Sequence, residues 1–145
     1  MKVFCDTNVL VAACLANHPH HNAARPVLER IKAGRDEGCA ATHSLAESYA
    51  VLTRLPGANQ MAPSIAWQLV SENVIKNFSM IVLTATEYAK TLEGAAAIGL
   101  EGGKIYDALL LAAAVKSGAK RVYTFNLTRF RDMADVELRK RIVAP

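Results

Sequence analysis

Residues 2–16, KVFCDTNVLVAACLA, decide the fold of this chain. The run KVFC at residues 2–5 is typical of a short β-strand because it joins β-branched and aromatic side chains. Three polar residues, DTN at 6–8, then lead into an apolar stretch that predicts a helix ending near Ala16. A strand that passes directly into a helix in this way is a typical opening unit of an α/β domain.

The same alternation continues along the chain, without internal repeats or a dividing linker. Further strands are predicted at residues 39–42, 79–83, 121–124 and 141–143, the last at a sheet edge. Helices are predicted at residues 20–33, 45–54, 86–98 and 105–116, and from Pro63 onward. We therefore expect one α/β domain over residues 1–145, a three-layer α/β/α sandwich with a mainly parallel sheet of about 4–5 strands. In such sheets the ligand site lies beyond the carboxyl ends of the strands.

The composition excludes several classes of protein. Hydrophobic residues make up 52% of the 145 residues and charged residues 21%, which excludes a disordered chain. The three cysteines, Cys5, Cys14 and Cys39, form no CxxC pair and are expected to be buried thiols in a reducing compartment. No run reaches the length of a membrane helix, so we expect a soluble, cytoplasmic protein.

The positive charge is confined to the end of the chain. Residues 1–115 carry 9 basic and 10 acidic side chains, whereas residues 116–145 carry 8 basic and 3 acidic ones, and the total is +4. A basic terminal segment is most often a solvated surface. It favours nucleic-acid binding only if an active site lies beside it, which is the interpretation adopted here.

Polar side chains follow three of the predicted strands, and each also has a purely structural interpretation. Asp6 follows the first strand and could cap the next helix, and Glu47, expected in the first turn of its helix, could simply be solvated. Asn126 follows the strand at 121–124 and fits an ordinary turn. Asp107 is less ordinary, because it is the only charged residue in the apolar run IYDALLLAAAV at 105–115.

Together these four residues predict a metal site. The alternating fold would bring Asp6, Glu47, Asp107 and Asn126 to one edge of the sheet. Close carboxylates repel one another, so at neutral pH the cluster needs a divalent cation or bound protons. Oxygen ligands without paired Cys or His favour Mg²⁺ or Mn²⁺, as one or two ions, and such ions suit phosphodiester hydrolysis.

The sequence resembles the PIN-domain ribonucleases, specifically the VapC-type toxins of toxin–antitoxin pairs. The matching pieces run in order along nearly the whole chain: VFCDTNVLVAA, HPHHNAA, AATHSLAESYAVLTRLP, KIYDALLLAAA and VYTFNLTRF. By this resemblance Asp6, Glu47 and Asp107 would be the acidic metal-binding triad. The supporting positions would be Thr7, Asn8 and Thr124, with Asn126 in place of a fourth acid.

The resemblance implies a Mg²⁺-dependent endoribonuclease that cuts tRNA or rRNA, is inhibited by a VapB-type antitoxin and forms a homodimer. Arg129 and Arg131 would be the nearest contacts to RNA phosphates. Two departures stand out. Asn126 supplies no negative charge for a second metal, and Arg129 occupies a position where many relatives carry an acid.

Two other functions remain open at this point. A non-catalytic binding module that kept the fold would explain the missing fourth acid. An aspartyl-nucleophile phosphohydrolase would use Asp6, although those enzymes usually carry a second Asp where this chain has Asn8. His18, His20 and His21 are interpreted as a surface turn away from the acidic edge, and the glycines of 99–103 as a flexible connection without a P-loop ending.

Overall fold

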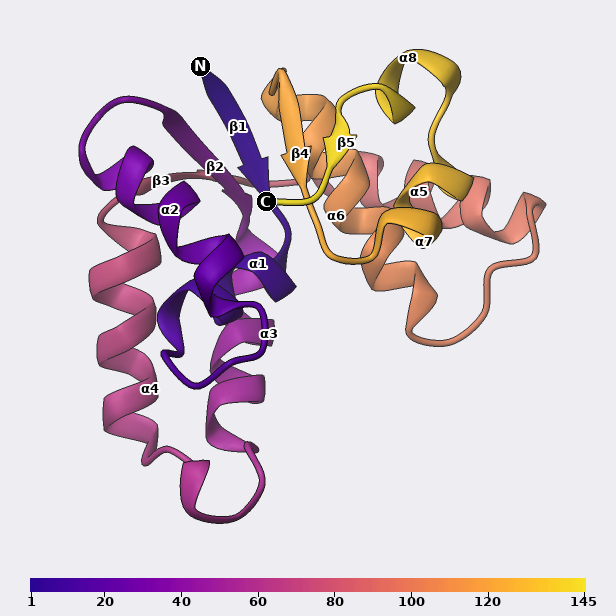
Figure 1. The fold of residues 1–145 in the computed structure, drawn as a ribbon. Coiled ribbons are helices and arrows are strands. Elements are labelled where there is room, and N and C mark those ends of the chain that lie inside the picture. Colours follow the sequence, from indigo (N-terminus) through magenta and orange to yellow (C-terminus); the bar gives the residue numbers. More distant parts are fainter.

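The computed structural model describes all residues 1–145 and contains one five-stranded sheet (Figure 1). Its strands are β1 (Lys2–Cys5), β2 (Glu37–Ala41), β3 (Phe78–Ile81), β4 (Arg121–Tyr123) and β5 (Ile142–Val143). The order across the sheet is β3-β2-β1-β4-β5, and every neighbouring pair is parallel. Because β1 lies in the centre, the carboxyl end of β1 is flanked by those of β2 and β4.

Helices cover both faces of this sheet, as the predicted α/β/α sandwich requires. The α-helices are α1 (Thr7–Cys14), α2 (His21–Lys32), α3 (Thr42–Thr53), α4 (Pro63–Val70), α5 (Ala85–Ala97), α6 (Lys104–Ser117), α7 (Leu127–Met133) and α8 (Val136–Arg139). A short 3₁₀ turn (Gly57–Asn59) precedes α4, and one π-helical segment (Ser71–Ile75) continues it.

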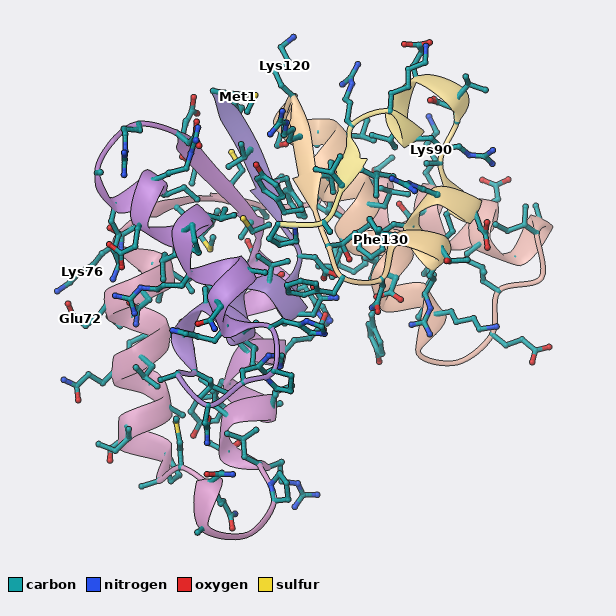
Figure 2. The ribbon with its side chains drawn as sticks, in the orientation of Figure 1. Met1, Glu72, Lys76, Lys90, Lys120 and Phe130 are labelled. Atoms are coloured by element: carbon teal, nitrogen blue, oxygen red, sulfur yellow. The ribbon has the colours of Figure 1, made fainter.

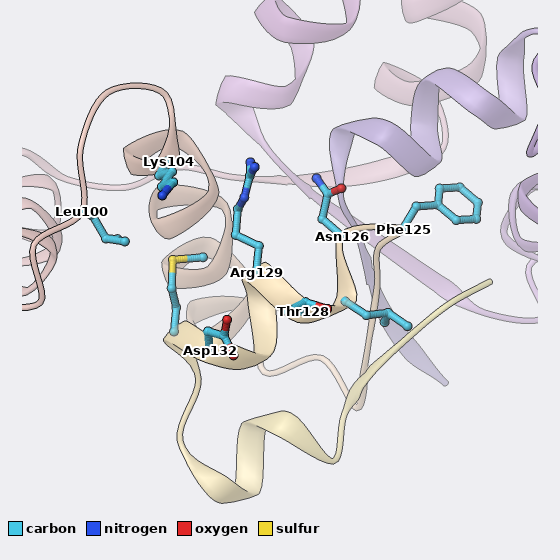
Figure 3. Close-up of a pocket in the computed structure, with 9 residues that line it drawn as sticks. Leu100, Lys104, Phe125, Asn126, Thr128, Arg129 and Asp132 are labelled. Carbon is cyan, nitrogen blue, oxygen red and sulfur yellow. The ribbon is translucent and has the colours of Figure 1, made fainter.

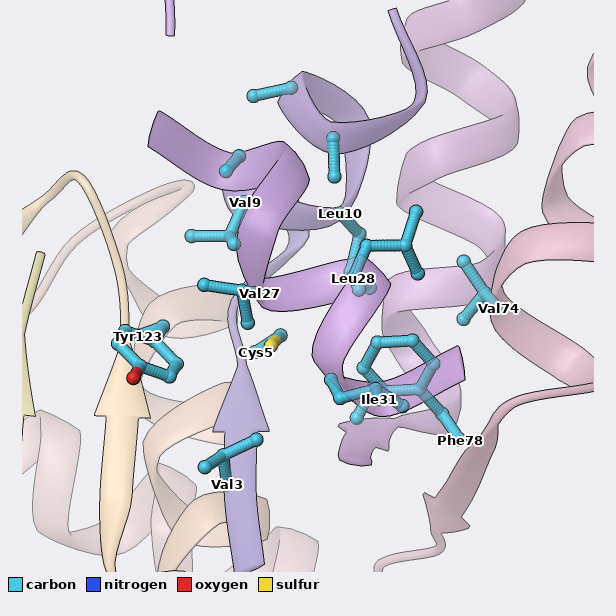
Figure 4. Packing of buried hydrophobic residues seen from close by; sticks show 14 residues of the cluster. Val3, Cys5, Val9, Leu10, Val27, Leu28, Ile31, Val74, Phe78 and Tyr123 are labelled. Carbon is cyan, nitrogen blue, oxygen red and sulfur yellow. The ribbon is translucent and has the colours of Figure 1, made fainter. Parts of the chain in front are cut away.

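The alternation of side chains along β1 divides the core between the two faces. Val3 and Cys5 pack on α1 and α2 on one face (Figure 4), whereas Phe4 packs on α6 and α7 on the other. All three side chains are at most 1% exposed. Since a strand buried on both faces must be apolar throughout, this pattern explains the uninterrupted run VFC.

Gly38 lies inside β2, which begins at Glu37, two residues before the predicted strand. A Cβ atom at this position would lie 2.8 Å from Ile31 Cγ2 and 2.9 Å from Phe78 Cδ1. Only glycine allows α2 and β3 to approach the strand this closely. Helix α2 ends at Lys32, and Gly34, two residues later, has a left-handed φ of +68°.

Other differences concern helix boundaries. Helix α3 begins at Thr42, directly after β2 and three residues before the predicted start, so Glu47 lies in its second turn and not its first. Helices α7 and α8 were not predicted. The spacing of the apolar residues Leu127, Phe130 and Met133 could have indicated α7, whose Phe130 is fully buried.

The basic residues of the last thirty positions are more dispersed than the sequence interpretation assumed. Figure 2 shows Lys120 beside Met1, at the amino ends of the strands and therefore at the edge opposite their carboxyl ends. Lys116 pairs with Glu87, and Arg131 donates to the Ile142 carbonyl. Lys120 therefore lies away from the carboxyl edge, and Lys116 and Arg131 already have partners within the chain, so RNA contact by the basic segment as a whole stays a prediction.

No helix of the structure is long and apolar enough to cross a membrane.

The buried Asp36 carboxylate gives the fold an acid-sensitive contact. Arg30 Nε lies 2.7 Å from its Oδ2 and the Met1 amino group 3.0 Å from its Oδ1, and these partners lower the pKa of Asp36 to about 2. Because this pKa is depressed, the stabilisation is complete above the ordinary Asp pKa and is lost as pH falls toward about 2.

We expect Asp36→Asn to lower the free energy of unfolding at neutral pH by about 1–2 kcal/mol, since Arg30 is half exposed and the contact is partly screened. Urea unfolding at neutral pH and at pH about 2 measures the effect. The difference between parent and variant should shrink at the lower pH. A difference that is independent of pH would contradict this explanation.

Candidate active site

Asp6 lies directly after β1, at the centre of the carboxyl edge of the sheet. Its side chain does not cap α1. Instead, Oδ2 accepts a hydrogen bond of 2.6 Å from the Thr124 hydroxyl, just past β4. Asp6 is only 2% exposed, and burial, together with the nearby Asp107 and Glu47 carboxylates, raises its pKa to about 7. Such a group favours either a proton or a cation at neutral pH.

Asp107 lies in the first turn of α6, close enough to Asp6 and Glu47 to raise the pKa of both. It does not cap the helix. Its Oδ2 lies 2.6 Å from Nη1 of Arg129 on α7, while the Asp107 side chain remains 13% exposed. The carboxylate that was hardest to explain from sequence therefore has a cationic partner in this structure.

Glu47 approaches Asp6 and Asp107 from α3. Burial is the main cause that raises its pKa, followed by the charge of Asp107, whereas the Thr7 hydroxyl acts in the opposite direction. Its Oε1 is buried without an aligned hydrogen-bond partner, although His43 Nε2 lies 2.8 Å away. A buried carboxylate oxygen left without a hydrogen bond is costly, and this one remains available to a ligand.

These donors fit a hard divalent cation in chemistry, because three carboxylates supply oxygen ligands and one of their oxygens is buried and unsatisfied. In the present arrangement no group of three or more His, Cys, Asp and Glu side chains is placed to hold one ion. The Arg129–Asp107 pair gives a physical reason, since the guanidinium occupies one of the carboxylates. Ion binding would require Arg129 to release or share Asp107.

The predicted supporting residues connect the strand ends around Asp6. Thr7 donates to the Ser44 hydroxyl at 2.9 Å, which ties the start of α1 to α3. Asn8 does not contact Asp6. It donates to the Thr124 hydroxyl at 3.5 Å and accepts from the Phe125 N–H at 3.3 Å, so it fixes the β4–α7 connection.

An open pocket of about 550 Å³ is lined by Arg129, the partner of Asp107, although Asp6, Glu47 and Asp107 themselves do not line it. Asn126 and Arg129 line it from the β4–α7 region and Lys104 from the start of α6 (Figure 3). The sequence interpretation missed Lys104, whose only signal was its position three residues before Asp107. Asn126 thus lines a pocket whose charged residues are Lys104, Arg129 and Asp132, whereas Arg131 donates to the Ile142 carbonyl of the C-terminal strand.

Two aromatic pairs also lie beside the acidic residues and were not predicted. His43 stacks on Tyr106 with ring centroids 5.0 Å apart, and His20 stacks on Phe125 at 4.3 Å. The turn predicted around His18 and His20 is present. Its link to the acidic edge runs through Phe125, which directly follows Thr124, the partner of Asp6.

Comparison with known proteins identifies the family. The PIN domain family model matches residues 3–136. The chain is 32% identical to ribonuclease VapC40 of Mycobacterium tuberculosis over 138 residues, which cover 94% of this chain and 91% of that protein. The chain belongs to the PIN-domain family and is of the VapC type. It is also 30% identical to ribonuclease VapC27 of M. tuberculosis over 115 residues, 79% of this chain and 78% of that protein.

Solved structures match the fold of this PIN domain. One is M. tuberculosis VapC20, described as a sarcin-ricin loop cleaving toxin, with a TM-score of 0.71, 22% identity and 99% of both chains covered. Another is VapBC2 of Rickettsia felis bound to a promoter DNA fragment, with a TM-score of 0.62, 19% identity, and 88% of this chain and 90% of that chain covered. At these identities the likeness supports the fold alone.

Proposed function

We propose that this VapC-type protein is a Mg²⁺- or Mn²⁺-dependent endoribonuclease, the toxin of a toxin–antitoxin pair, acting as one PIN domain over residues 1–145. The observation that carries the proposal is the proximity of Asp6 after β1, Glu47 on α3 and Asp107 on α6, where burial, with smaller contributions from the Asp107 and Glu47 charges, raises the pKa of Asp6 to about 7. A cluster of this kind is stabilised by a divalent cation and is poorly suited to a purely structural role.

Each residue has a distinct role in the proposed reaction. Asp6, Asp107 and Glu47 would hold one or two ions, directly or through water. A bound divalent cation would supply stabilisation of the charge that develops on the phosphodiester. Glu47 orients or deprotonates the attacking water, a role that suits a carboxylate whose pKa is raised by burial. Thr124 fixes the Asp6 carboxylate, and Arg129 and Lys104 attract the RNA backbone.

The names of the relatives support the partners that we propose. VapC20 is described as a sarcin-ricin loop cleaving toxin, which supports a structured RNA loop as the substrate, and we propose that this loop lies in rRNA or tRNA. VapBC2 is described as bound to promoter DNA, which supports a VapB-type antitoxin as the inhibitor. We also propose a homodimer that acts in the cytoplasm.

Total RNA from bacteria that lack this protein tests the proposed function. The purified protein is incubated with that RNA in Mg²⁺ or in EDTA, and the new ends are sequenced. We expect Mg²⁺-dependent cleavage at one or a few sites, with Glu137→Gln, an exposed acid on α8, as an active control. Equal products in Mg²⁺ and EDTA would argue against the metal, and no products in Mg²⁺ against the nuclease.

One observation favours a second candidate, a PIN-like module with weak or absent catalysis. Arg129 lies 2.6 Å from Asp107 and no three acidic or histidine ligands are placed around one point. By contrast, the structure offers little support for an aspartyl-nucleophile phosphohydrolase. Asp6 is 2% exposed and its Oδ2 is hydrogen-bonded to Thr124, so phosphate has poor access to it.

A further inference from the structure

The stacked pairs His43–Tyr106 and His20–Phe125 lie on opposite sides of Asp6. His43 follows the carboxyl end of β2 by two residues, and Phe125 follows that of β4 by two residues. Asp6 follows the end of β1, which lies between β2 and β4 in the sheet. The topology therefore places Asp6 between the strand ends that carry the two aromatic pairs.

Each pair is fixed to the candidate active site. Tyr106 directly precedes Asp107, and its partner His43 lies 2.8 Å from the Glu47 carboxylate. The interplanar angle of the His43–Tyr106 stack is 11° and Tyr106 is 49% exposed. A half-exposed ring that a second ring supports loses little conformational entropy when a further flat group binds to it.

The second pair has the same construction. Phe125 is half buried and its backbone N–H donates to Asn8, which fixes the ring relative to the end of β4. His20 is exposed and stacks on it at an interplanar angle of 19°. Phe125 also borders the pocket that holds Lys104 and Arg129, although its ring points away from these two side chains (Figure 3).

We infer that these two ring pairs are nucleobase platforms, which hold bases of an RNA strand on the two sides of the acidic residues. This inference rests on the proposed ribonuclease function. Flat rings near a pocket that holds cations match the chemistry of unpaired nucleotides, whose bases stack on aromatic side chains while the phosphates contact Lys and Arg.

The distance between strands limits which bases of one RNA strand can occupy both platforms. Neighbouring strands lie about 4.8 Å apart, so the ends of β2 and β4 are separated by roughly 10 Å. Successive bases within a helical strand are separated by about 3.4 Å along the axis. Two bases that rest on the two platforms are therefore not stacked neighbours. The strand between them is spread apart, with its backbone over Asp6, Glu47 and Asp107.

A binding experiment without cleavage tests the platforms. Fluorescein-labelled RNA of mixed sequence, short and without self-complementarity, is titrated with the protein in EDTA while anisotropy is recorded. Tyr106→Ala and Phe125→Leu should each weaken binding by about 5- to 100-fold, the range expected for loss of one stacked base. Tyr106→Phe keeps the ring and should bind as the parent does. Trp67→Ala removes an exposed aromatic ring on α4 and should have no effect.

An abasic oligonucleotide of the same length separates stacking from other causes. It keeps the phosphates and lacks the bases, so Tyr106→Ala and Phe125→Leu should bind it as the parent does. Parent-like binding of the mixed-sequence RNA by both variants would overturn the inference, as would an equal loss on the abasic strand. If the parent cleaves RNA but either contradicting result is obtained, the platform proposal is wrong and the proposed ribonuclease function stands. If both variants lose binding as expected but the parent never cleaves RNA, the proposed catalysis is wrong and the platform proposal stands.

Discussion

Asp107→Asn is expected to reduce Mg²⁺-dependent RNA cleavage by about 1000-fold or more while leaving the fold intact. The substitution removes one of three carboxylates that would hold the cation, and a bound metal contributes several kcal/mol to stabilisation of the transition state. It also removes the negative charge that attracts Arg129, whose Nη1 lies 2.6 Å from Asp107. Cleavage rates on the RNA site identified by sequencing measure the loss.

Two controls make this result specific. Glu93→Gln removes an acid on α5 and should cleave at the parent rate. Circular dichroism should show unchanged helix content for Asp107→Asn, because its side chain makes no helix-capping hydrogen bond. Cleavage within a few-fold of the parent would remove Asp107 from the mechanism.

Asp6→Asn is expected to raise the stability of the metal-free protein while it abolishes cleavage. The pKa of Asp6 is raised to about 7 by burial, with a smaller contribution from Asp107, so its ionised form is destabilised in the folded state. Asn keeps an oxygen that can accept the Thr124 hydrogen bond without the charge. At pH about 8 the gain should be about 2–4 kcal/mol in the free energy of unfolding.

The pH dependence of stability sets the direction of the change expected for Asp6→Asn. An unfolded Asp loses its proton near pH 4, whereas folded Asp6 keeps it until about pH 7, so the parent should lose stability as pH rises between these values. The Asp36 contact is constant over this range, because its pKa is about 2. Thermal unfolding in EDTA at several pH values measures both proteins. A variant no more stable than the parent at pH about 8 would show that Asp6 is not destabilised by its charge.

The sequence predicts the scaffold well because the scaffold depends on local patterns. The buried run at 2–5, the helix at 105–116 and the alternation between them are properties of neighbouring residues, and the five parallel strands confirm the fold class. The unusual position of Asp107 is also visible locally, since one charge stands in an apolar helix. Helix boundaries shift by a few residues, as at Thr42, because caps and register depend on tertiary packing.

The details of the site depend on contacts between distant segments and could not be predicted. Arg129 reaches Asp107 through α7, a short helix that the sequence interpretation left out. His20 and Phe125 are far apart in sequence and meet only because β4 lies beside β1. The net charge of the last thirty residues is a poor guide to where these charges lie, because a sum of charges does not reveal tertiary pairs such as Lys116 with Glu87.

The central claim is that Asp6, Glu47 and Asp107 together bind a divalent cation, and a calorimetric titration of Mn²⁺ into the metal-free protein at neutral pH tests it most directly. We expect saturable binding by the parent at one or two sites. We also expect binding at least about tenfold weaker in Asp107→Asn, as for loss of a metal-site interaction, and unchanged binding in Glu93→Gln. Absence of binding by the parent at millimolar Mn²⁺, or equal binding by the parent and Asp107→Asn, would contradict the claim.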